Sequence, residues 1–344
     1  MSVYLETLRG RDGERAPVWF MRQAGRYLPE YRRIRERHSF WEMVRTPELA
    51  AEVTLQPVER FGVDAAILFQ DIMSPLPDMG VEVEFAPGPV IARPVRDAAS
   101  VAALRVPPAG EVAPFAAEAV RLASQASPVP VIGFAGAPLT LAAYLVEGGG
   151  SKDFATFRAF LRSEPLVAEA LLAKLADVAV GYLASQVAAG ARAVQLFDSW
   201  AGLLDRRTYA RHGAPHLRRI VRAVRDLGVP VTYMAVGAGH LLEEVAGLGC
   251  DAVSVDWRTP LRAARRLLPG KALQGNLDPA ALFAPREALL AEALRVLDEG
   301  RGGPHVFNLG HGLLPGTDPD AVAAVVDLVK GYARRPASAA EVGA

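Results

Sequence analysis

The chain has 344 residues, 51% of them hydrophobic, and its 38 basic residues balance its 38 acidic residues. A chain without net charge has no global field to attract nucleic acid or a membrane surface, so neither is an expected partner. The single cysteine, Cys250, excludes an intrachain disulfide framework and a cysteine-based metal cluster, and it fits a reducing compartment. The first residues lack a basic segment followed by an apolar core, and no 18-residue apolar span occurs, so we expect a cytoplasmic protein.

Short apolar runs rich in Val, Ile, Leu and Phe predict eight strands. They are Pro17–Met21, Ala65–Phe69, Pro130–Phe134, Ala193–Phe197, Val231–Ala235, Ala252–Asp256, Ala272–Gly275 and His305–Leu309. Amphipathic segments predict helices at Pro47–Phe61, Leu166–Ala189, Arg206–Leu227, Leu241–Leu248, Arg286–Glu299 and Asp318–Tyr332. Apolar strands alternating with helices indicate a parallel sheet covered on both faces. Eight such units predict an α/β fold with a single (β/α)8 barrel of the TIM type, and an open doubly wound sheet is the alternative.

The residues that follow the predicted strands favour the barrel, because a barrel places its active-site cleft at the C-terminal ends of all its strands. Polar residues or glycines follow all eight strands: Arg22, Gln70 with Asp71, Gly136, Asp198 with Ser199, Gly237, Asp256 with Trp257, Asn276 to Asp278, and Gly310 to Gly312. We expect one barrel domain over residues 1–335 and a flexible tail over residues 336–344. The Pro-rich excursion Pro75–Pro114 and the glycine run Gly148–Gly150 are both candidate lids.

Two arginines four residues apart, Arg22 and Arg26, follow the first predicted strand. Guanidinium groups hold carboxylates and phosphates bidentately, so this pair predicts an anion site. The alternative is a solvated helix face, because six arginines fall between Arg22 and Arg37. The position at a strand end, with Gly25 between the two arginines, favours a ligand role.

Asp71 follows an apolar run, so its carboxylate is expected to emerge from an apolar wall into the cleft. The alternative role is an N-cap, but Pro75 and Pro77 argue against a long helix there. A carboxylate in this place can accept hydrogen bonds from a substrate N–H group and can stabilise positive charge that develops nearby.

Three further polar residues are candidates at strand ends. His311 lies between two glycines, which favours contact with a ligand, and Tyr144 follows the third strand, where packing is an equal alternative. Ser199 lacks a nucleophile elbow and a His/Asp relay, so we predict a hydrogen-bonding role. His212 and His216 have the spacing of a zinc pair, but Pro215 lies between them and no acid fills the metalloprotease position, so we interpret both as surface residues.

Five segments resemble those of one known family. Residues 20–32 and 133–140 resemble the two signature segments of the uroporphyrinogen decarboxylase family, and residues 69–72, 197–202 and 309–312 resemble three further segments in the same order. The resemblance covers roughly residues 3–333, and the first segment is long enough to be highly specific. Leu139, where members of the family often carry an aromatic residue, is a small departure.

The resemblance implies a (β/α)8 barrel, usually a homodimer, that removes carbon dioxide from the four acetate side chains of uroporphyrinogen III and yields coproporphyrinogen III. This is a step of haem biosynthesis that needs neither a metal nor an organic cofactor. By the same resemblance, Asp71, Arg22 and Arg26 would be catalytic, and Asp71 would face the pyrrole N–H groups. The implied substrate-binding set is Arg22, Gln23, Ala24, Gly25, Arg26, Asp71, Tyr144, Ser199 and His311.

The residue types fit this chemistry. Uroporphyrinogen carries eight carboxylates, which suit arginines at the rim of the cleft, and an anionic Asp71 would favour a cationic protonated pyrrole over the neutral ground state. Either an arginine in an unusual environment or an ordered water would donate the first proton. A zinc-dependent methyltransferase on a related barrel is one alternative, but Cys250 precedes the sixth strand, at the opposite end of the barrel. A catalytically silent tetrapyrrole-binding protein is the other.

Overall fold

The structure is a computed structural model that describes residues 2–85 and 88–333, so the predicted tail at 336–344 lies outside the described residues. Seven parallel strands form one sheet in the order β1-β4-β5-β6-β7-β8-β9. Their bounds are β1 Ala66–Ile67, β4 Val131–Gly136, β5 Ala193–Asp198, β6 Val231–Ala235, β7 Ala252–Ser254, β8 Ala272–Leu277 and β9 His305–Leu309. All residues of these strands are buried, as in a parallel sheet with both faces covered.

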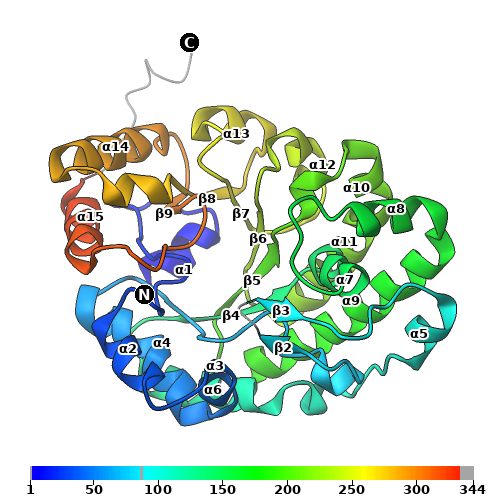
Figure 1. Ribbon diagram of the computed structural model, residues 1–344. Helices are drawn as coiled ribbons and strands as arrows, with labels where there is room; N and C mark the ends of the chain where they lie inside the picture. The colour runs from blue at the N-terminus through cyan, green and yellow to red at the C-terminus, as the bar shows by residue number, and fades with distance from the viewer. Residues whose placement is uncertain (1, 86–87, 334–344) are drawn as a thin grey trace.

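The strands follow one another in space in the order in which they occur along the chain. A doubly wound sheet instead reverses its strand order at a switch point, so this alternative is wrong. In Figure 1 the sheet curls around the centre of the molecule, and the helices surround it. The α/β class is therefore confirmed, together with seven of the eight predicted strands.

The first predicted strand, Pro17–Met21, does not join the sheet as a regular strand. Val18 forms an isolated parallel bridge with Phe307 of β9, and Phe307 N donates to Pro17 O over 2.8 Å. On its other side, Asp64 N donates to Val18 O over 2.8 Å. The segment thus lies between β9 and the residues that precede β1, where an eighth strand would be.

Side chains replace the missing strand-to-strand hydrogen bonds of this segment. Val18 N donates to Asp64 Oδ2 over 2.8 Å, Phe20 N to Gln23 Oε1 over 2.9 Å, and Met21 N to Asn308 Oδ1 over 3.1 Å. Because carboxylate and carboxamide oxygens satisfy these N–H groups, the backbone needs no regular ladder to remain buried.

Helices connect and cover the strands. They are α1 Val3–Leu8, α2 Pro29–Arg35, α3 Phe40–Arg45, α4 Pro47–Phe61, α5 Ala98–Ala103, α6 Pro114–Ala126, α7 Pro138–Glu147, α8 Ala155–Ser163, α9 Pro165–Ala188, α10 Arg206–His212, α11 Ala214–Arg225, α12 Leu242–Ala246, α13 Leu261–Leu267, α14 Arg286–Glu299 and α15 Pro319–Gly331. Several begin with proline, which has no N–H to leave unpaired in the first turn and a preset φ. Short 3₁₀ turns are η1 Pro77–Met79, η2 Ala109–Glu111, η3 Ala201–Leu203, η4 Gly239–Leu241 and η5 Pro279–Phe283.

The helix predicted over Arg206–Leu227 is two helices, α10 and α11, separated at Gly213. A Cβ on Gly213 would lie 2.6 Å from Leu139 Cδ1 of α7, so the chain passes too close to α7 for a side chain. Pro215, in the first turn of α11, has no N–H to continue the hydrogen bonds of α10, so a single helix ends here.

The two candidate lids contact each other. Within the Pro75–Pro114 excursion, β2 Glu84–Phe85 pairs with β3 Pro89–Val90 in a small antiparallel sheet. Val90 forms an antiparallel bridge with Gly149, where a Cβ would lie 2.9 Å from Pro89 O. The glycine run is therefore the surface against which the excursion packs, and movement of either segment as a lid stays a prediction.

Candidate active site

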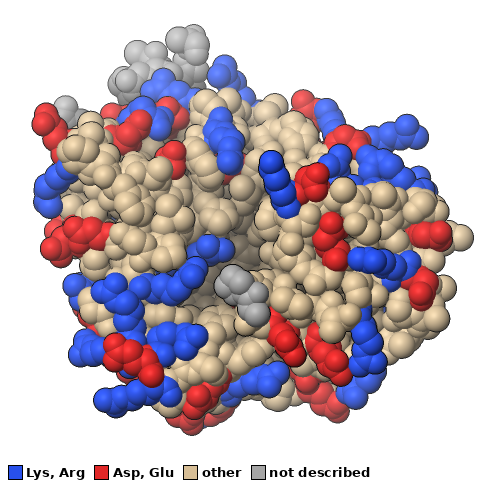
Figure 2. Space-filling model, in the orientation of Figure 1, with Lys and Arg blue, Asp and Glu red and all other residues tan. Residues whose placement is uncertain are grey.

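The predicted site residues follow neighbouring segments of the sheet at its C-terminal end. Arg22 follows the 17–21 segment, Asp71 follows β1, Tyr144 lies in α7 after β4, Ser199 follows β5, and His311 follows β9. Figure 2 shows a hollow near the centre of this face, with Lys and Arg side chains along one edge. Segments that are distant in the sequence thus meet around one hollow.

Arg22 occupies a strained turn that aims its side chain over the glycine loop. Its φ of 61° is in the left-handed region, which costs a residue with a side chain free energy. A Cβ on Gly312 would lie 2.5 Å from Arg22 Cδ and 2.7 Å from Arg22 Cγ, so the stem of the arginine rests directly on this glycine. Only a residue without a side chain leaves room for Arg22 in this position.

The Arg22 guanidinium reaches solvent in the hollow, but the surrounding protein partly removes its water. This desolvation lowers the pKa of Arg22, and the like charge of Arg26 lowers it further. Asp71 and Tyr144 act in the opposite direction. Arg26, Asp71 and Tyr144 therefore each lie within electrostatic reach of Arg22.

Asp71 presents one free carboxylate oxygen. Its Oδ1 accepts a hydrogen bond of 2.9 Å from Met73 N, which fixes the rotamer, and the described part of the chain gives Oδ2 no donor. Burial raises the pKa of Asp71, whereas Met73 N–H and the charge of Arg22 favour the anion. A partly desolvated carboxylate with one open oxygen is suited to accept N–H donors from a ligand.

Tyr144 and Ser199 lie on the next part of the rim, and both are partly exposed. The Tyr144 ring packs edge-on against Phe154 and Trp200, with centroids 5.6 and 6.0 Å away. Burial raises the pKa of Tyr144, so its hydroxyl stays protonated at neutral pH. Tyr144 therefore combines the packing role with a polar group that faces Asp71 and Arg22.

His311 is neutral at physiological pH. Burial, followed by the positive charges of Arg22 and Arg258, lowers its pKa to about 4, and Asp256 opposes this. A neutral imidazole offers one donor and one acceptor to a ligand and adds no charge.

Gln23, unlike its neighbours, presents no side-chain group to the hollow. It is fully buried, its Oε1 accepts from Phe20 N over 2.9 Å, and its Nε2 donates to Ala65 O over 2.9 Å. The side chain therefore pins the arginine turn to the residue before β1. Ala24 is also buried, whereas Gly25 is partly exposed within the turn.

Sequence reasoning assigned no role to Asp198, which the structure places in a buried polar network. Thr140 Oγ1 and the Tyr233 hydroxyl donate to its two oxygens over 2.8 and 2.9 Å, and Tyr209 donates to the Tyr233 hydroxyl over 3.0 Å. Burial raises the pKa of Asp198 to about 6. Because Thr140 belongs to α7, the network fixes the helix that carries Tyr144. The strand-end position of Asp198 was the available signal.

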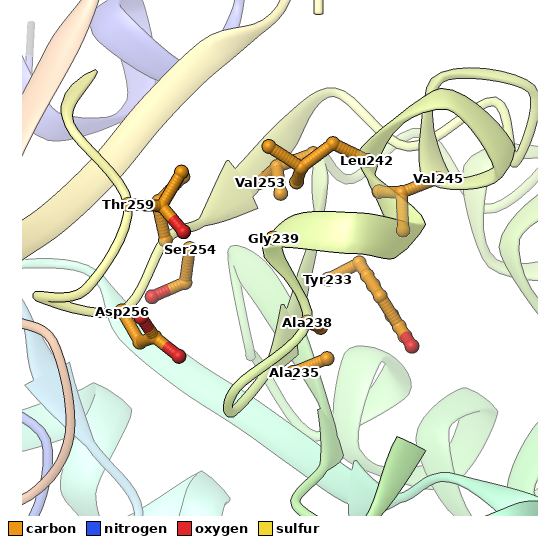
Figure 3. A pocket seen from close by; sticks show the side chains of 11 residues that line it. Tyr233, Ala235, Ala238, Gly239, Leu242, Val245, Val253, Ser254, Asp256 and Thr259 are labelled. Carbon is orange, nitrogen blue, oxygen red and sulfur yellow. The ribbon is translucent and has the colours of Figure 1, made fainter. Parts of the chain in front are cut away.

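A separate cavity of about 10 Å³ lies behind the ends of β6 and β7, with room for about one water molecule. Figure 3 shows Ser254, Asp256 and Thr259 on one side and apolar side chains of α12 on the other. It is too small for an organic ligand, and it adds no substrate site.

The described residues contain no group of three or more His, Cys, Asp and Glu side chains that could hold a metal ion. Cys250 is buried just before β7, and burial raises its pKa to about 11.

The prediction that His212 and His216 are surface residues is wrong: both are 5% exposed, because they face the contact between α9, α10 and α11. In the described part of the chain, no helix combines the length and the apolar character that crossing a membrane requires.

Several known proteins are similar to this chain. The chain is 46% identical to a uroporphyrinogen decarboxylase from Geobacter sp. (strain M21), over 96% of this chain and 99% of the relative. It is 48% identical to one from Salinispora tropica, over 97% and 91%. A methyltransferase from Methanosarcina mazei has a similar fold, with a TM-score of 0.78 and 21% identity over 95% of this chain and 97% of its own.

The family model for uroporphyrinogen decarboxylase (URO-D) matches residues 1–332, which include the Arg22 turn, Asp71 and the 309–312 loop. The chain belongs to the uroporphyrinogen decarboxylase family.

Proposed function

We propose that this chain removes carbon dioxide from the four acetate side chains of uroporphyrinogen III, which gives coproporphyrinogen III, and that it needs no metal or organic cofactor. Family membership supports the reaction. One observation supports this assignment of the site most directly. Asp71 and Arg22 follow adjacent segments of the sheet, and each charge influences the pKa of the other residue at the same hollow.

Substrate binding rests on charge. Arg22 and Arg26 hold carboxylates of the tetrapyrrole at the edge of the hollow, where guanidinium forks match carboxylate geometry. Tyr144, Ser199 and His311 add neutral polar contacts around the rim. Gln23 contributes by holding the turn, and Ala24 and Gly25 contribute through the backbone of that turn.

Asp71 acts on the ring. Its open Oδ2 faces the pyrrole N–H groups, and its negative charge stabilises the cation that forms when the ring carbon next to the acetate-bearing carbon is protonated, which places positive charge on the acetate-bearing carbon. The electrons of the bond to the carboxylate then flow into the cationic ring and carbon dioxide leaves. A proton added to the exocyclic carbon, with loss of the ring proton, gives the methyl group and restores the pyrrole. Each cycle replaces one carboxylate by one hydrogen.

Two groups fit the role of first proton donor, Arg22 and a water molecule. The lowered pKa of Arg22 is the change that an acid role for this residue requires.

We further propose one domain over residues 1–335, in which the 17–21 segment closes the curled sheet into a (β/α)8 barrel. The hydrogen bonds of this segment to β9 and to Asp64 support the closure. A homodimer in the cytoplasm is proposed from the resemblance and from the single cysteine.

The zinc-dependent methyltransferase alternative fits the site poorly, although a methyltransferase shares the fold. The thiol of Cys250 lies before β7, away from the hollow, and burial disfavours the thiolate that zinc needs.

The test is anaerobic incubation of the purified protein with uroporphyrinogen III in the presence of a chelator, followed by oxidation and counting of the carboxyl groups. The proposal predicts a fall from eight to four. Eight carboxyl groups on a substrate that the folded protein binds would instead indicate a tetrapyrrole-binding protein.

A further inference from the structure

The assigned site residues occupy only part of the rim. In spatial order they follow β9, the 17–21 segment, β1, β4 and β5. The loops after β6, β7 and β8 contribute none of them. Both assigned arginines belong to one turn, yet a tetrapyrrole carries carboxylates around its whole circumference. The assigned residues alone give the carboxylates on the far side no cationic partner.

Arg258, two residues past Asp256 at the end of β7, supplies positive charge on that side. Its guanidinium carbon lies over the Trp257 ring, 3.9 Å from the ring centroid, in a cation–π contact that uses none of its N–H donors. Its side chain is 55% exposed. The loop itself is rigid, because the buried Asp256 carboxylate accepts from Arg258 N over 2.9 Å and from Gly237 N.

Most of the hydrogen-bonding capacity of Arg258 is unused. The one hydrogen bond that its guanidinium makes within the described residues is Nη1 to Asp256 Oδ2 at 3.4 Å, which is long, and that oxygen already accepts from Gly237 N. An arginine has five N–H donors, so a bidentate edge remains for an anion.

Arg258 also belongs to the electrostatic environment of the hollow. The positive charges of Arg22 and Arg258 both lower the pKa of His311, so both arginines lie within electrostatic reach of this ring. The loops touch directly, because a Cβ on Gly310 would collide with Trp257 N. Arg22 therefore meets this loop at Gly312, and the segment that carries Arg258 meets it at Gly310.

We infer that Arg258 binds a side-chain carboxylate of the tetrapyrrole on the side away from Arg22 and Arg26, and so fixes the orientation of the ring for each successive decarboxylation. This inference rests on the proposed function. It makes Arg258 a determinant of binding and orientation, separate from the Asp71 chemistry.

The test compares wild type with Arg258→Gln and Arg258→Lys. Arg301→Gln is the matched control, because Arg301 also stacks on an aromatic ring, Tyr332 at 5.2 Å, but precedes β9 at the other end of the sheet. Arg258→Gln is expected to raise KM for uroporphyrinogen III about 5- to 10-fold, with kcat within about two-fold, as for loss of one solvent-accessible charge-assisted bond. Lysine restores part of the KM, and Arg301→Gln leaves it unchanged.

A second measurement, the accumulation of partly decarboxylated intermediates, reports on the orientation of the ring in the site. Intermediates with seven, six and five carboxyl groups are expected to accumulate with Arg258→Gln, because they leave the site before the next cycle. Competitive inhibition by coproporphyrinogen III identifies the carboxylate: weaker inhibition of Arg258→Gln indicates a propionate, and unchanged inhibition with a raised KM indicates an acetate.

Unchanged KM and unchanged intermediates in Arg258→Gln would overturn the inference. So would a lowered kcat and thermal midpoint with KM unchanged, since these indicate a structural role in the loop. If wild type leaves all eight carboxyl groups intact, the proposed function fails, and anaerobic measurement of uroporphyrinogen III binding by the same variants still decides the inference.

Discussion

Gly312→Ala is expected to move Arg22 without unfolding the protein. The added Cβ would lie 2.5 Å from Arg22 Cδ and 2.7 Å from Cγ, whereas carbon atoms in contact lie 3.5 to 4.0 Å apart. The arginine must therefore shift by about 1 Å. A misplacement of about 1 Å costs a positioned catalytic group about 100-fold in rate, or about 2.7 kcal/mol in the activation barrier.

The fold is expected to tolerate this change. The backbone of Gly312 lies outside the left-handed region, and the displaced group is a side chain that reaches solvent. Alanine in place of glycine also lowers the entropy of the unfolded chain, which is worth about 0.4–1 kcal/mol to the folded state. The predicted variant thus has a thermal midpoint close to that of wild type.

The assay is kcat/KM for uroporphyrinogen III, measured anaerobically beside a thermal unfolding curve. Gly316→Ala is the matched control in the same loop, because its Cβ would lie 3.6 Å from the nearest atom, Phe283 Cε1, in ordinary contact. A folded Gly312→Ala with wild-type kcat/KM would refute the claim that this glycine places Arg22 for catalysis.

Three further predictions concern buried polar groups. Folding favours the protonated form of Asp198, whose pKa is about 6, so this residue's contribution to stability is full below pH 4 and is lost as the pH rises through 6. The free energy of unfolding of wild type and of Asp198→Asn, measured in urea between pH 4 and pH 6, should differ by an amount that changes by about 3 kcal/mol across this range. A difference that stays constant with pH would contradict the prediction. His311 should titrate near pH 4 by NMR, and Arg22→Gln should raise that pKa; a wild-type value near 6.5 would be inconsistent with burial of the ring and with the nearby charges of Arg22 and Arg258. Gln23→Leu should lower the free energy of unfolding by about 2–4 kcal/mol, because two buried backbone groups lose their partners, and unchanged stability would show that Gln23 does not pin the turn.

Local sequence signals predict the bounds of some helices closely. The predicted ranges Pro47–Phe61 and Arg286–Glu299 match α4 and α14 at both ends. Gly62 takes a left-handed conformation directly after α4, a stop signal that the sequence displays. At Gly213, the hydrophobic spacing predicts one helix instead of two, although Pro215 two residues later is itself a local signal against a continuous helix.

The 17–21 segment shows a second limit. Its apolar pattern is that of a strand, and its position beside β9 is that of a strand. Asp64, Gln23 and Asn308 nevertheless take its backbone hydrogen bonds, and no local pattern shows that side chains from three other places will do so.

The sequence likewise predicts some features of the candidate site and not others. The strand-end rule predicted that Asp71 and His311 would lie near Arg22, since parallel strands bring their C-terminal ends together. It could not distinguish the exposed Arg22 from the adjacent buried Gln23, because both are polar residues of one turn. The Asp198 network was also hidden, as its partners come from α7 and β6.

The central claim is that Asp71 stabilises the cationic ring and contributes little to affinity. Asp71→Asn keeps an oxygen for Met73 N and removes the charge, so the turn is retained. The account predicts that kcat for uroporphyrinogen III falls by about 100- to 1,000-fold while the dissociation constant changes by less than about three-fold. A folded Asp71→Asn variant with near-wild-type turnover would contradict it.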